Sequence, residues 1–416
     1  MSVIGQQVEL IDKDGEILHL SHKLPLAVGD VLRLNGVPSS SVLVTEKKDA
    51  DGMHFTAKFL FNTVFRNVGA IPTQRKVLKT SAAEKTFYEK IVIGPEVSGN
   101  LTRYIIEMDR AHFCEYVEKT FADLIKRENL IQAGDDITIG FSGGVDSTLL
   151  LRLLLDPRHR IENTNFRAVT VGTLAGTHKA SFIEQFCRAN SVESHFIDDD
   201  SIQKTFNLRD KAANVIDQVL ASEHNQKAIF VVQHIIRRML EEFRESVGSD
   251  KIILGLEREA LLTSIMAFYL SGYPTPGLFK KSDGKNHYVF PLMSLFKREE
   301  SLYLSLKMPE YSEVGRPEHH RSRTFDLHSS EWRGTVMLLV GYLLDAFPGI
   351  DVYLENAAGR ILRNLVTPIK FEICKNCEGS YTNTSVEDEF CETCRVLSDV
   401  GLLRNSAEVA KKMLHA

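Results

Sequence analysis

A short stretch of small and polar residues could bind a phosphate group. In DITIGFSGGVDSTLLLRLLL, Gly143 and Gly144 separate an alternating apolar run from a leucine-rich run. Glycine lets the backbone approach a ligand closely, and the start of the following helix would present free N–H groups and a positive dipole end. Ser142 and Ser147 add hydroxyl donors, and Asp146 can cap the helix or hold a phosphate-bridging cation. The alternative is a plain glycine-rich turn of an α/β protein.

Four of the six cysteines lie close together near the C-terminus, in CKNCEGSYTNTSVEDEFCETC. They form two C-x2-C pairs separated by thirteen residues, namely Cys374, Cys377, Cys391 and Cys394. Clustered thiolates in a reducing compartment favour metal over disulfides, and this spacing suits tetrahedral zinc. We therefore expect one structural zinc site, with an iron–sulfur cluster or a redox pair as the alternatives.

The order of apolar patterns indicates the elements that would position these residues. Strands are expected at 136–141, 166–173, 194–200 and 251–256, alternating with helices at 146–155, 177–190, 225–247 and 258–272. Such alternation predicts a parallel sheet with helices on both faces. The predicted domains are a small β-rich accessory domain (1–105), an α/β domain with the candidate phosphate site (106–365), and a zinc ribbon with a C-terminal helix (366–416).

Length and composition exclude several classes of protein. The 416 residues, with 43% hydrophobic and 25% charged residues, are typical of a globular protein of two or three domains. No apolar run is long enough to span a bilayer and no signal peptide is evident, so a cytoplasmic location without a membrane partner is expected. The net charge of -5 means that any RNA contact needs a local basic patch.

The motif SGGVDS resembles the pyrophosphate loop of the PP-loop (N-type) ATP pyrophosphatases, which have an adenine nucleotide alpha hydrolase-like fold. The resemblance implies that ATP is split into AMP and pyrophosphate, usually by adenylation of an acceptor oxygen. The chain as a whole resembles the tRNA 2-thiouridine synthetase branch of these enzymes. This resemblance rests on SGGVDS together with the four late cysteines, and on two further stretches, FPLMSLFKREESLYLSLKMPEY and GRILRNL. That branch adenylates a uridine oxygen and then delivers sulfur to the base.

The resemblance also implies roles for individual residues. The pyrophosphate end of ATP, with Mg²⁺, would be held by Ser142, Gly143, Gly144, Asp146 and Ser147. Arg237 and Arg238 would also contact the ATP phosphates. The catalytic residues would be Asp146, Ser147 and Arg237. Glu259, or Glu257, would stand in for an acidic motif that is altered in LGLEREALLT, and His178 and Lys179 lie where the family places nucleotide-binding side chains. Without the resemblance, the arginines would be a solvated helix face and the glutamates an ordinary helix start.

The chain also departs from the family pattern. Residues 1–105 contain no second zinc-binding module, and Phe230 and Gln233 stand where many members carry a C-x-x-C pair. Cys114 and Cys187 lie among apolar neighbours and are expected in the core. The resemblance therefore implies neither an iron–sulfur site nor an internal persulfide carrier, so transferred sulfur would come from an external donor.

These observations support three hypotheses about function. The first is an ATP pyrophosphatase that adenylates its acceptor for sulfur transfer, similar to tRNA thiolation enzymes, with ATP, Mg²⁺ and one Zn²⁺ as cofactors. Its partners would be tRNA, an external sulfur donor or carrier protein, and a second copy of the chain. The second is an adenylating ligase, amidating or thiolating, that acts on a small molecule, peptide or protein. The third is an inactive nucleotide-binding partner of an active paralogue.

Overall fold

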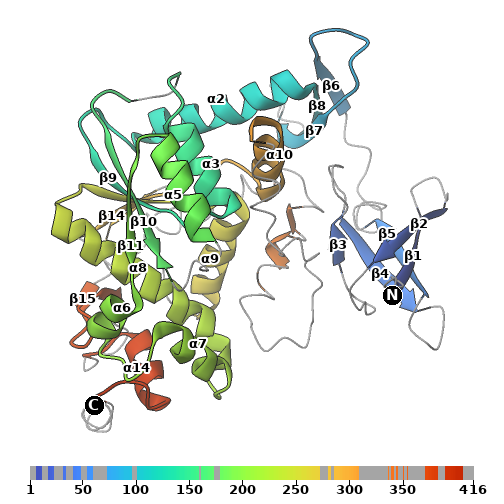
Figure 1. Cartoon of the computed structure of the whole chain (residues 1–416). Helices are drawn as coiled ribbons and strands as arrows, with labels where there is room; N and C mark the ends of the chain where they lie inside the picture. The colour runs from blue at the N-terminus through green and yellow to red at the C-terminus, as the bar shows by residue number, and fades with distance from the viewer. Residues whose placement is uncertain are drawn as a thin grey trace. The chain divides into compact units, whose positions relative to one another are not determined.

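The computed structural model divides the chain into two compact units, residues Met1–Tyr116 with Arg316–Ala357, and Val117–Gly315 with Ala358–Ala416. Figure 1 shows their elements, with the second unit containing the large sheet and its helices. The structure describes residues 6–11, 17–22, 31–33, 41–47, 54–59, 73–95, 101–158, 161–172, 179–271, 280–282, 285–308, 371–382 and 389–405, with single positions between 336 and 354.

The second unit is built on a six-stranded sheet with the order β11-β10-β9-β12-β14-β13. Its strands are β9 (Asp136–Gly140), β10 (Asn165–Val171), β11 (Glu193–Ile197), β12 (Lys251–Leu254), β13 (Lys280–Ser282) and β14 (His287–Val289). All neighbouring pairs are parallel except β13 with β14. The predicted parallel α/β sheet is therefore confirmed, with one antiparallel edge strand added.

Helices connect and cover these strands. They are α2 (Arg110–Glu128), α3 (Val145–Leu154), α5 (Ala180–Ala189), α6 (Asp199–Phe206), α7 (Ala212–Leu220), α8 (Ala228–Val247), α9 (Arg258–Ser271) and α10 (Lys297–Lys307). In α3, leucines on all sides are buried, as expected of a helix enclosed by its neighbours. The strand expected at 194–200 ends at Ile197, because the Asp198 carboxylate accepts a hydrogen bond from Ser201 N at 2.9 Å and caps α6.

The central position of β9 determines where a ligand can bind. Successive crossovers lead from β9 to β10 and on to β11, whereas β12 pairs with the other edge of β9. Strand order thus changes direction between β9 and β12. In open α/β sheets, ligands bind beyond the carboxyl ends of the strands at such a point. The segments that follow Gly140 and Leu254 both lie at this place.

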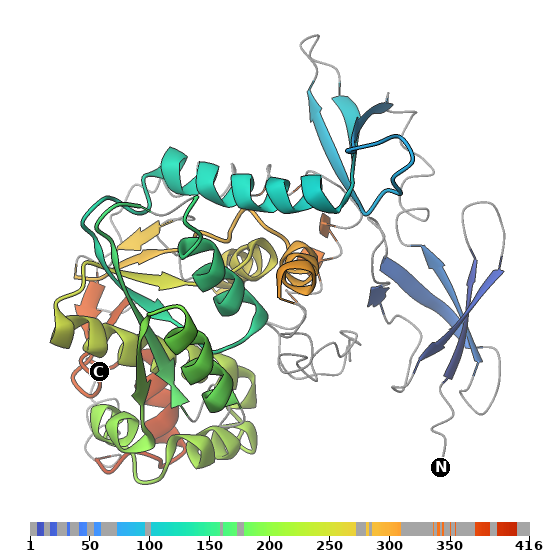
Figure 2. The same cartoon turned by 45° about the horizontal axis from the view of Figure 1, so that its top comes forward.

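The N-terminal region is β-rich, as expected. One mixed sheet has the order β2-β1-β5-β4-β3 and another the order β6-β8-β7. The first contains β1 (Gln6–Ile11), β2 (Ile17–His22), β3 (Val31–Arg33), β4 (Ser41–Lys47) and β5 (His54–Phe59), and the second contains β6 (Thr73–Leu78), β7 (Tyr88–Pro95) and β8 (Leu101–Met108). Figure 2 shows the chain running from β8 into the long helix α2.

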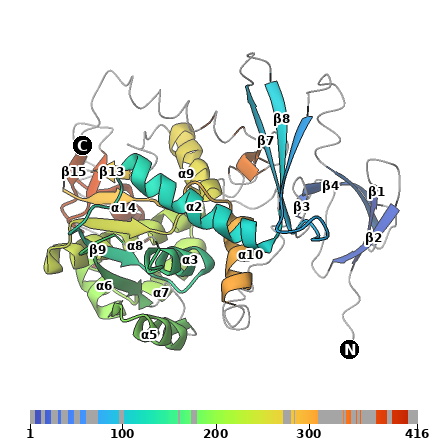
Figure 3. The ribbon, with the colours of Figure 1, turned by 90° about the horizontal axis from the view of Figure 1, so that it is seen from above.

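The C-terminal part that the structure describes, residues 371–382 and 389–405, is called the ribbon below. It contains β15 (Phe371–Ile373), β16 (Ser380–Thr382) and α14 (Glu392–Asp399). Helix α14 contacts α8, as can be followed in Figure 3. The buried side chains of the ribbon, its cysteines included, continue into the apolar cluster of α6, α7 and α8. The ribbon therefore shares a core with the second unit.

Among the helices that the structure describes, none combines the length and the apolar character needed to cross a membrane.

Candidate nucleotide site and metal centre

The predicted phosphate-binding stretch forms a tight turn between β9 and α3, which we call the glycine turn (residues 142–147). Gly143 has a φ of +63°, a conformation that L side chains rarely adopt. Gly144 is the N-cap of α3 and provides no side-chain cap. The first backbone bond of the helix runs from Thr148 N to Gly144 O at 2.9 Å. The amides of the preceding first turn thus have no partner within the helix, which suits an anion.

The two serines of the turn lie next to each other. The Oγ atoms of Ser142 and Ser147 are 3.2 Å apart, and Ser147 Oγ donates to Gly144 O at 3.2 Å. The end of β12 lies against the same turn, because a Cβ atom on Gly255 would be 2.9 Å from the carbonyl carbon of Asp146. Any side chain at position 255 would therefore displace the first turn of α3.

Two lysines converge on Asp146. Lys297, at the start of α10, donates from Nζ to Asp146 Oδ1. Lys179, which precedes α5, lies close enough that burial and the charge of Lys297 lower its pKa, while Asp146 acts in the opposite direction. For Lys297, burial lowers the pKa, but the carboxylates of Asp146 and Glu300 outweigh it, so the pKa is raised. Two ammonium groups beside a helix N-terminus form a positively charged surface for phosphate oxygens.

Three buried glutamates surround this cationic centre. Glu257 is 2% exposed and its Oε2 accepts from Ala260 N at 2.7 Å, while Glu259 Oε2 accepts from Lys297 N at 3.2 Å. Glu300 is fully buried, and neither of its carboxyl oxygens has a hydrogen-bond partner within the described residues. The structure thus brings Glu257 and Glu259 close to the glycine turn.

Burial changes the protonation of these glutamates. Burial, and then the negative charge of Glu259, raise the pKa of Glu257 to about 8. Burial, and then the charge of Asp146, raise the pKa of Glu300 well above its ordinary value. Glu257 is therefore largely neutral at pH 7 when no ligand is bound, and the raised pKa of Glu300 favours its neutral form as well. A cation that enters the site could ionise them, and carboxylate oxygens are the ligands that Mg²⁺ prefers.

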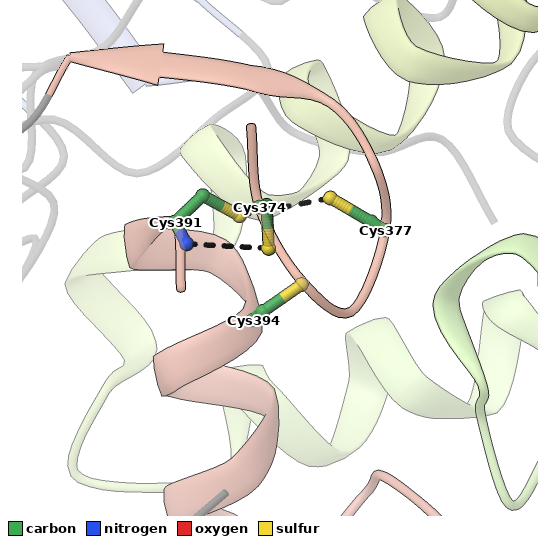
Figure 4. A group of neighbouring side chains, drawn as sticks. All are labelled: Cys374, Cys377, Cys391 and Cys394. Atoms are coloured by element: carbon green, nitrogen blue, oxygen red, sulfur yellow. Dashed lines mark hydrogen bonds between the residues drawn. The ribbon is translucent and has the colours of Figure 1, made fainter. Parts of the chain in front are cut away.

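The four late cysteines come together as the spacing predicted. Cys374, Cys377, Cys391 and Cys394 are at most 2% exposed, and their Sγ atoms all lie within 4.8 Å of one another. Figure 4 shows the four side chains converging, two from the strand-side loop and two from the start of α14. This cysteine tetrad can bind a metal ion.

One sulfur–sulfur distance in the tetrad matches the edge of a tetrahedral site for a single ion. The Sγ atoms of Cys377 and Cys391 are 3.8 Å apart. A tetrahedral site with metal–sulfur bonds of about 2.3 Å has edges of about 3.8 Å. An iron–sulfur cluster holds a cage of iron and sulfide between its thiolates and needs a wider separation. The thiolates are also supported from outside, since Cys391 N donates to Cys374 Sγ at 3.3 Å and Asn376 Nδ2 donates to Cys394 Sγ at 3.3 Å.

Arg237 and Arg238 have contacts that the resemblance did not imply. Both lie on α8, where Arg237 Nη2 donates to Ser380 O at 2.9 Å and Arg238 Nε donates to Cys377 O at 2.6 Å. Both arginines therefore face the ribbon. Their roles in ATP binding and catalysis stay predictions, and these contacts do not support them.

The other candidates from the sequence have simple outcomes. His178 lies outside the described residues. Cys114 and Cys187 are buried, and burial raises the pKa of Cys187 to about 11.

Sequence reasoning missed Gly255, Lys297 and Glu300 as individual residues. The last two start a helix in the segment FKREES, where a basic and an acidic residue three positions apart share a face.

Comparisons with known proteins agree with this geometry. No protein-family model matches the chain. It is 24% identical over 190 residues to a tRNA-cytidine(32) 2-sulfurtransferase of Cytophaga hutchinsonii, covering 45% of this chain and 62% of the relative. It is 46% identical over 46 residues to a tRNA(Ile)-lysidine synthase of Persephonella marina, covering 11% of this chain and 10% of the relative. The chain thus spans less than two thirds of the length of either relative.

A solved structure extends the similarity to most of the chain. The U34-tRNA thiolase NcsA from Methanococcus maripaludis, solved with its [4Fe-4S] cluster, aligns with a TM-score of 0.53 at 18% identity. The alignment covers 78% of this chain and 98% of that structure, which shows a shared fold. The glycine turn at the strand-order switch point, the two sequence relatives and this shared fold agree. In sequence and fold, the chain resembles the PP-loop ATP pyrophosphatase superfamily, and within it the tRNA thiolation branch.

Proposed function

We propose that the chain is a cytoplasmic ATP pyrophosphatase that adenylates an acceptor for sulfur transfer, as tRNA thiolation enzymes do. The observation that carries the proposal is the convergence of Lys297, Asp146 and the first-turn amides of α3 at the switch point of the sheet. The names of two similar proteins, a tRNA sulfurtransferase and a tRNA thiolase, support tRNA as the acceptor and partner.

The reaction requires the site to receive negative charge on pyrophosphate. An acceptor oxygen attacks the α-phosphorus of ATP, the bond from this phosphorus to the oxygen bridging the β-phosphorus breaks, and the electron pair leaves with pyrophosphate. The α3 amides and the Lys297 ammonium would stabilise that charge. Mg²⁺, when bound, would neutralise phosphate charge, and Asp146 and Glu259, whose carboxylates both contact Lys297, would hold it. A nucleophile then displaces AMP from the acceptor.

The sulfur itself would come from outside the chain. Beyond the tetrad, only Cys114 and Cys187 remain in the sequence, and both are buried. The raised pKa of Cys187 keeps it a thiol at neutral pH. An external sulfur donor or carrier protein is therefore part of the proposal. The same observation favours a second candidate, in which ammonia or an amine attacks an adenylated small molecule, peptide or protein.

We further propose that the tetrad holds one structural zinc ion. The four thiolates fill a tetrahedral shell and leave no open position for substrate, so this metal would stabilise the ribbon rather than take part in the reaction. Metal analysis should find about one zinc per chain and no iron or sulfide. Iron and sulfide in stoichiometric amounts would contradict this assignment.

Pyrophosphate release tests the enzymatic proposal. Release that depends on added tRNA supports the first candidate, and release with a small acceptor alone supports the second. Asp146→Ala should abolish release while circular dichroism stays unchanged. Asp200→Ala, in the exposed first turn of α6, is the matched control and should keep full activity. Unchanged turnover in Asp146→Ala would contradict the proposal, and ATP binding without turnover under any acceptor would indicate an inactive nucleotide-binding partner.

A further inference from the structure

A histidine of α8 lies directly against two cysteines of the tetrad. His234 Nε2 is 3.5 Å from Cys377 Sγ and 3.4 Å from Cys391 Sγ. The same two sulfur atoms are 3.8 Å from each other, so the imidazole nitrogen lies over one edge of the tetrad. At this position the ring could either bind the metal through Nε2 or donate a hydrogen bond to the sulfurs.

A neighbouring arginine decides between these two roles. Arg237 Nη2 is 2.9 Å from His234 Nδ1. A guanidinium group has donors and no acceptor, so Nδ1 must be the acceptor in this bond. In the neutral imidazole, the proton then resides on Nε2, the nitrogen that faces the sulfurs. Nε2 is therefore a hydrogen-bond donor to Cys377 and Cys391, and it has no lone pair for a metal.

A second α8 residue supplies charge at the same surface. Arg238 is 4% exposed, and its Nη1 has no hydrogen-bond partner among the residues that the structure describes. No ion pair joins it to a described carboxylate. A buried charge without a counter-charge is costly, and four thiolates around a divalent ion carry a net negative charge. A Cβ atom on Gly379 would be 3.0 Å from Arg238 Cδ and 3.4 Å from Cys377 Sγ, so the guanidinium stem and the thiolate are close neighbours.

We propose that His234 and Arg238 are positioning residues of the metal centre, with His234 donating Nε2–H to the thiolates of Cys377 and Cys391 and Arg238 balancing their charge. The inference rests on the proposed metal at the tetrad. It assigns α8 a function beyond covering the sheet, since residues outside the ribbon hold its thiolates in place. Groups of this kind orient metal ligands and tune their basicity.

Metal competition on the full-length protein tests the inference. Wild type, His234→Ala and His234→Gln would be loaded with Co²⁺ or Zn²⁺ and titrated with a chromophoric chelator. We expect His234→Ala to bind metal about 10- to 100-fold more weakly. His234→Gln should recover most of this loss, because its amide also donates a hydrogen bond. His224→Ala is the matched control, since His224 pairs with Asp399 of α14 at 3.6 Å and should not affect the metal.

The Co²⁺ absorption spectrum separates a donor from a ligand. Wild type and both His234 variants should show the same four-thiolate spectrum, with the sulfur-to-cobalt charge-transfer band shifted in His234→Ala, where the hydrogen bond to sulfur is lost. Wild-type metal affinity in His234→Ala would overturn the inference, as would a wild-type spectrum of three thiolates and one nitrogen. A wild-type chain that binds no metal at all would overturn the proposed metal centre as well.

Discussion

At the glycine turn the ion pair of Asp146 and Lys297 remains partly open to solvent, whereas the ribbon encloses its thiolates. Asp146 and Lys297 expose 29% and 33% of their side chains, but the four cysteines expose at most 2% of their surface. At the turn, an ammonium group pairs with a carboxylate that a ligand could replace. In the ribbon, hydrogen bonds from Asn376, His234 and a backbone amide surround the thiolates.

The difference distinguishes a site that exchanges its ligand from one that retains it. An ion pair near solvent contributes little to stability, so phosphate and Mg²⁺ can rearrange Asp146 and Lys297 at small cost. Thiolates in an apolar cluster have no alternative partner in water, and their metal is held as part of the fold. Changes at the turn should therefore affect activity first, and changes in the ribbon should affect stability first.

The largest expected effect is on stability, in Cys374→Ser. Loss of one thiolate should reduce zinc from about one per chain to well below that value. Because ribbon side chains continue into the cluster of α6 to α8, we expect the free energy of unfolding to fall by at least several kcal/mol, within the about 10–16 kcal/mol of structural zinc sites. Urea unfolding and metal analysis measure both quantities. The control variant Cys114→Ser, outside the ribbon, should retain about one zinc per chain. A Cys374→Ser variant with wild-type zinc content would show that the ribbon does not retain its metal in the way that distinguishes it from the glycine turn.

The next effect is on activity, in Lys297→Met, which keeps the length of the side chain and removes its charge. Loss of one electrostatic stabiliser of the leaving group should lower kcat for pyrophosphate release by about 10²- to 10³-fold. Zinc content and the urea midpoint should barely change. Lys307→Met, at the other end of α10 and 38% exposed, serves as the control. If Lys297→Met lost zinc but kept its activity, the glycine turn would act on stability rather than on activity, contrary to the expectation for this region.

The smallest effect concerns pH. Glu257 has a pKa of about 8 in the folded protein and an ordinary value of 4.5 when unfolded. Between these values the folded state holds a proton that the unfolded state has lost, so stability falls as pH rises, by at most about 1.4 kcal/mol per pH unit for this group. Glu257→Gln should flatten the dependence by this amount in urea unfolding from pH 5 to 8, and the exposed Glu242→Gln should not. Equal slopes in wild type and Glu257→Gln would show that Glu257 is ionised throughout.

Local sequence predicted the parts of both regions that consist of neighbouring residues. The glycine turn needs only a strand, two glycines and a helix start in succession, and the tetrad needs two short pairs of thiols. Lys297 reaches Asp146 across 151 positions, and such a contact depends on the fold rather than on a pattern. It could not be recognised before the path of the chain was known.

Some patterns permit more than one environment, and there the structure shows contacts that the sequence did not indicate. Arg237 and Arg238 could bind phosphates or carbonyl oxygens equally well, because a guanidinium donates to both, and in the structure they contact the ribbon. The sequence pattern extends the strand over the aspartates after Ile197, but Asp198 caps α6, because its carboxylate competes for a backbone amide. The sequence pattern does not indicate β6 and β8 individually, since Arg75, Lys76 and Arg103 interrupt their apolar patterns.

The union of the ribbon with the end of α6 has a consequence for biosynthesis. Asn376, which lies 170 residues after Phe206 in the sequence, donates from Nδ2 to the Phe206 carbonyl. Arg404 N likewise donates to Asn207 O. At ribosomal speeds of about 5–20 residues per second, Asn376 is synthesised roughly 10 to 30 s after Phe206. During this interval the apolar side of α6 to α8 is uncovered on the nascent chain. A chaperone that shields it, and a supply of metal when the last cysteine emerges, would decide how much of the newly made protein reaches its native state.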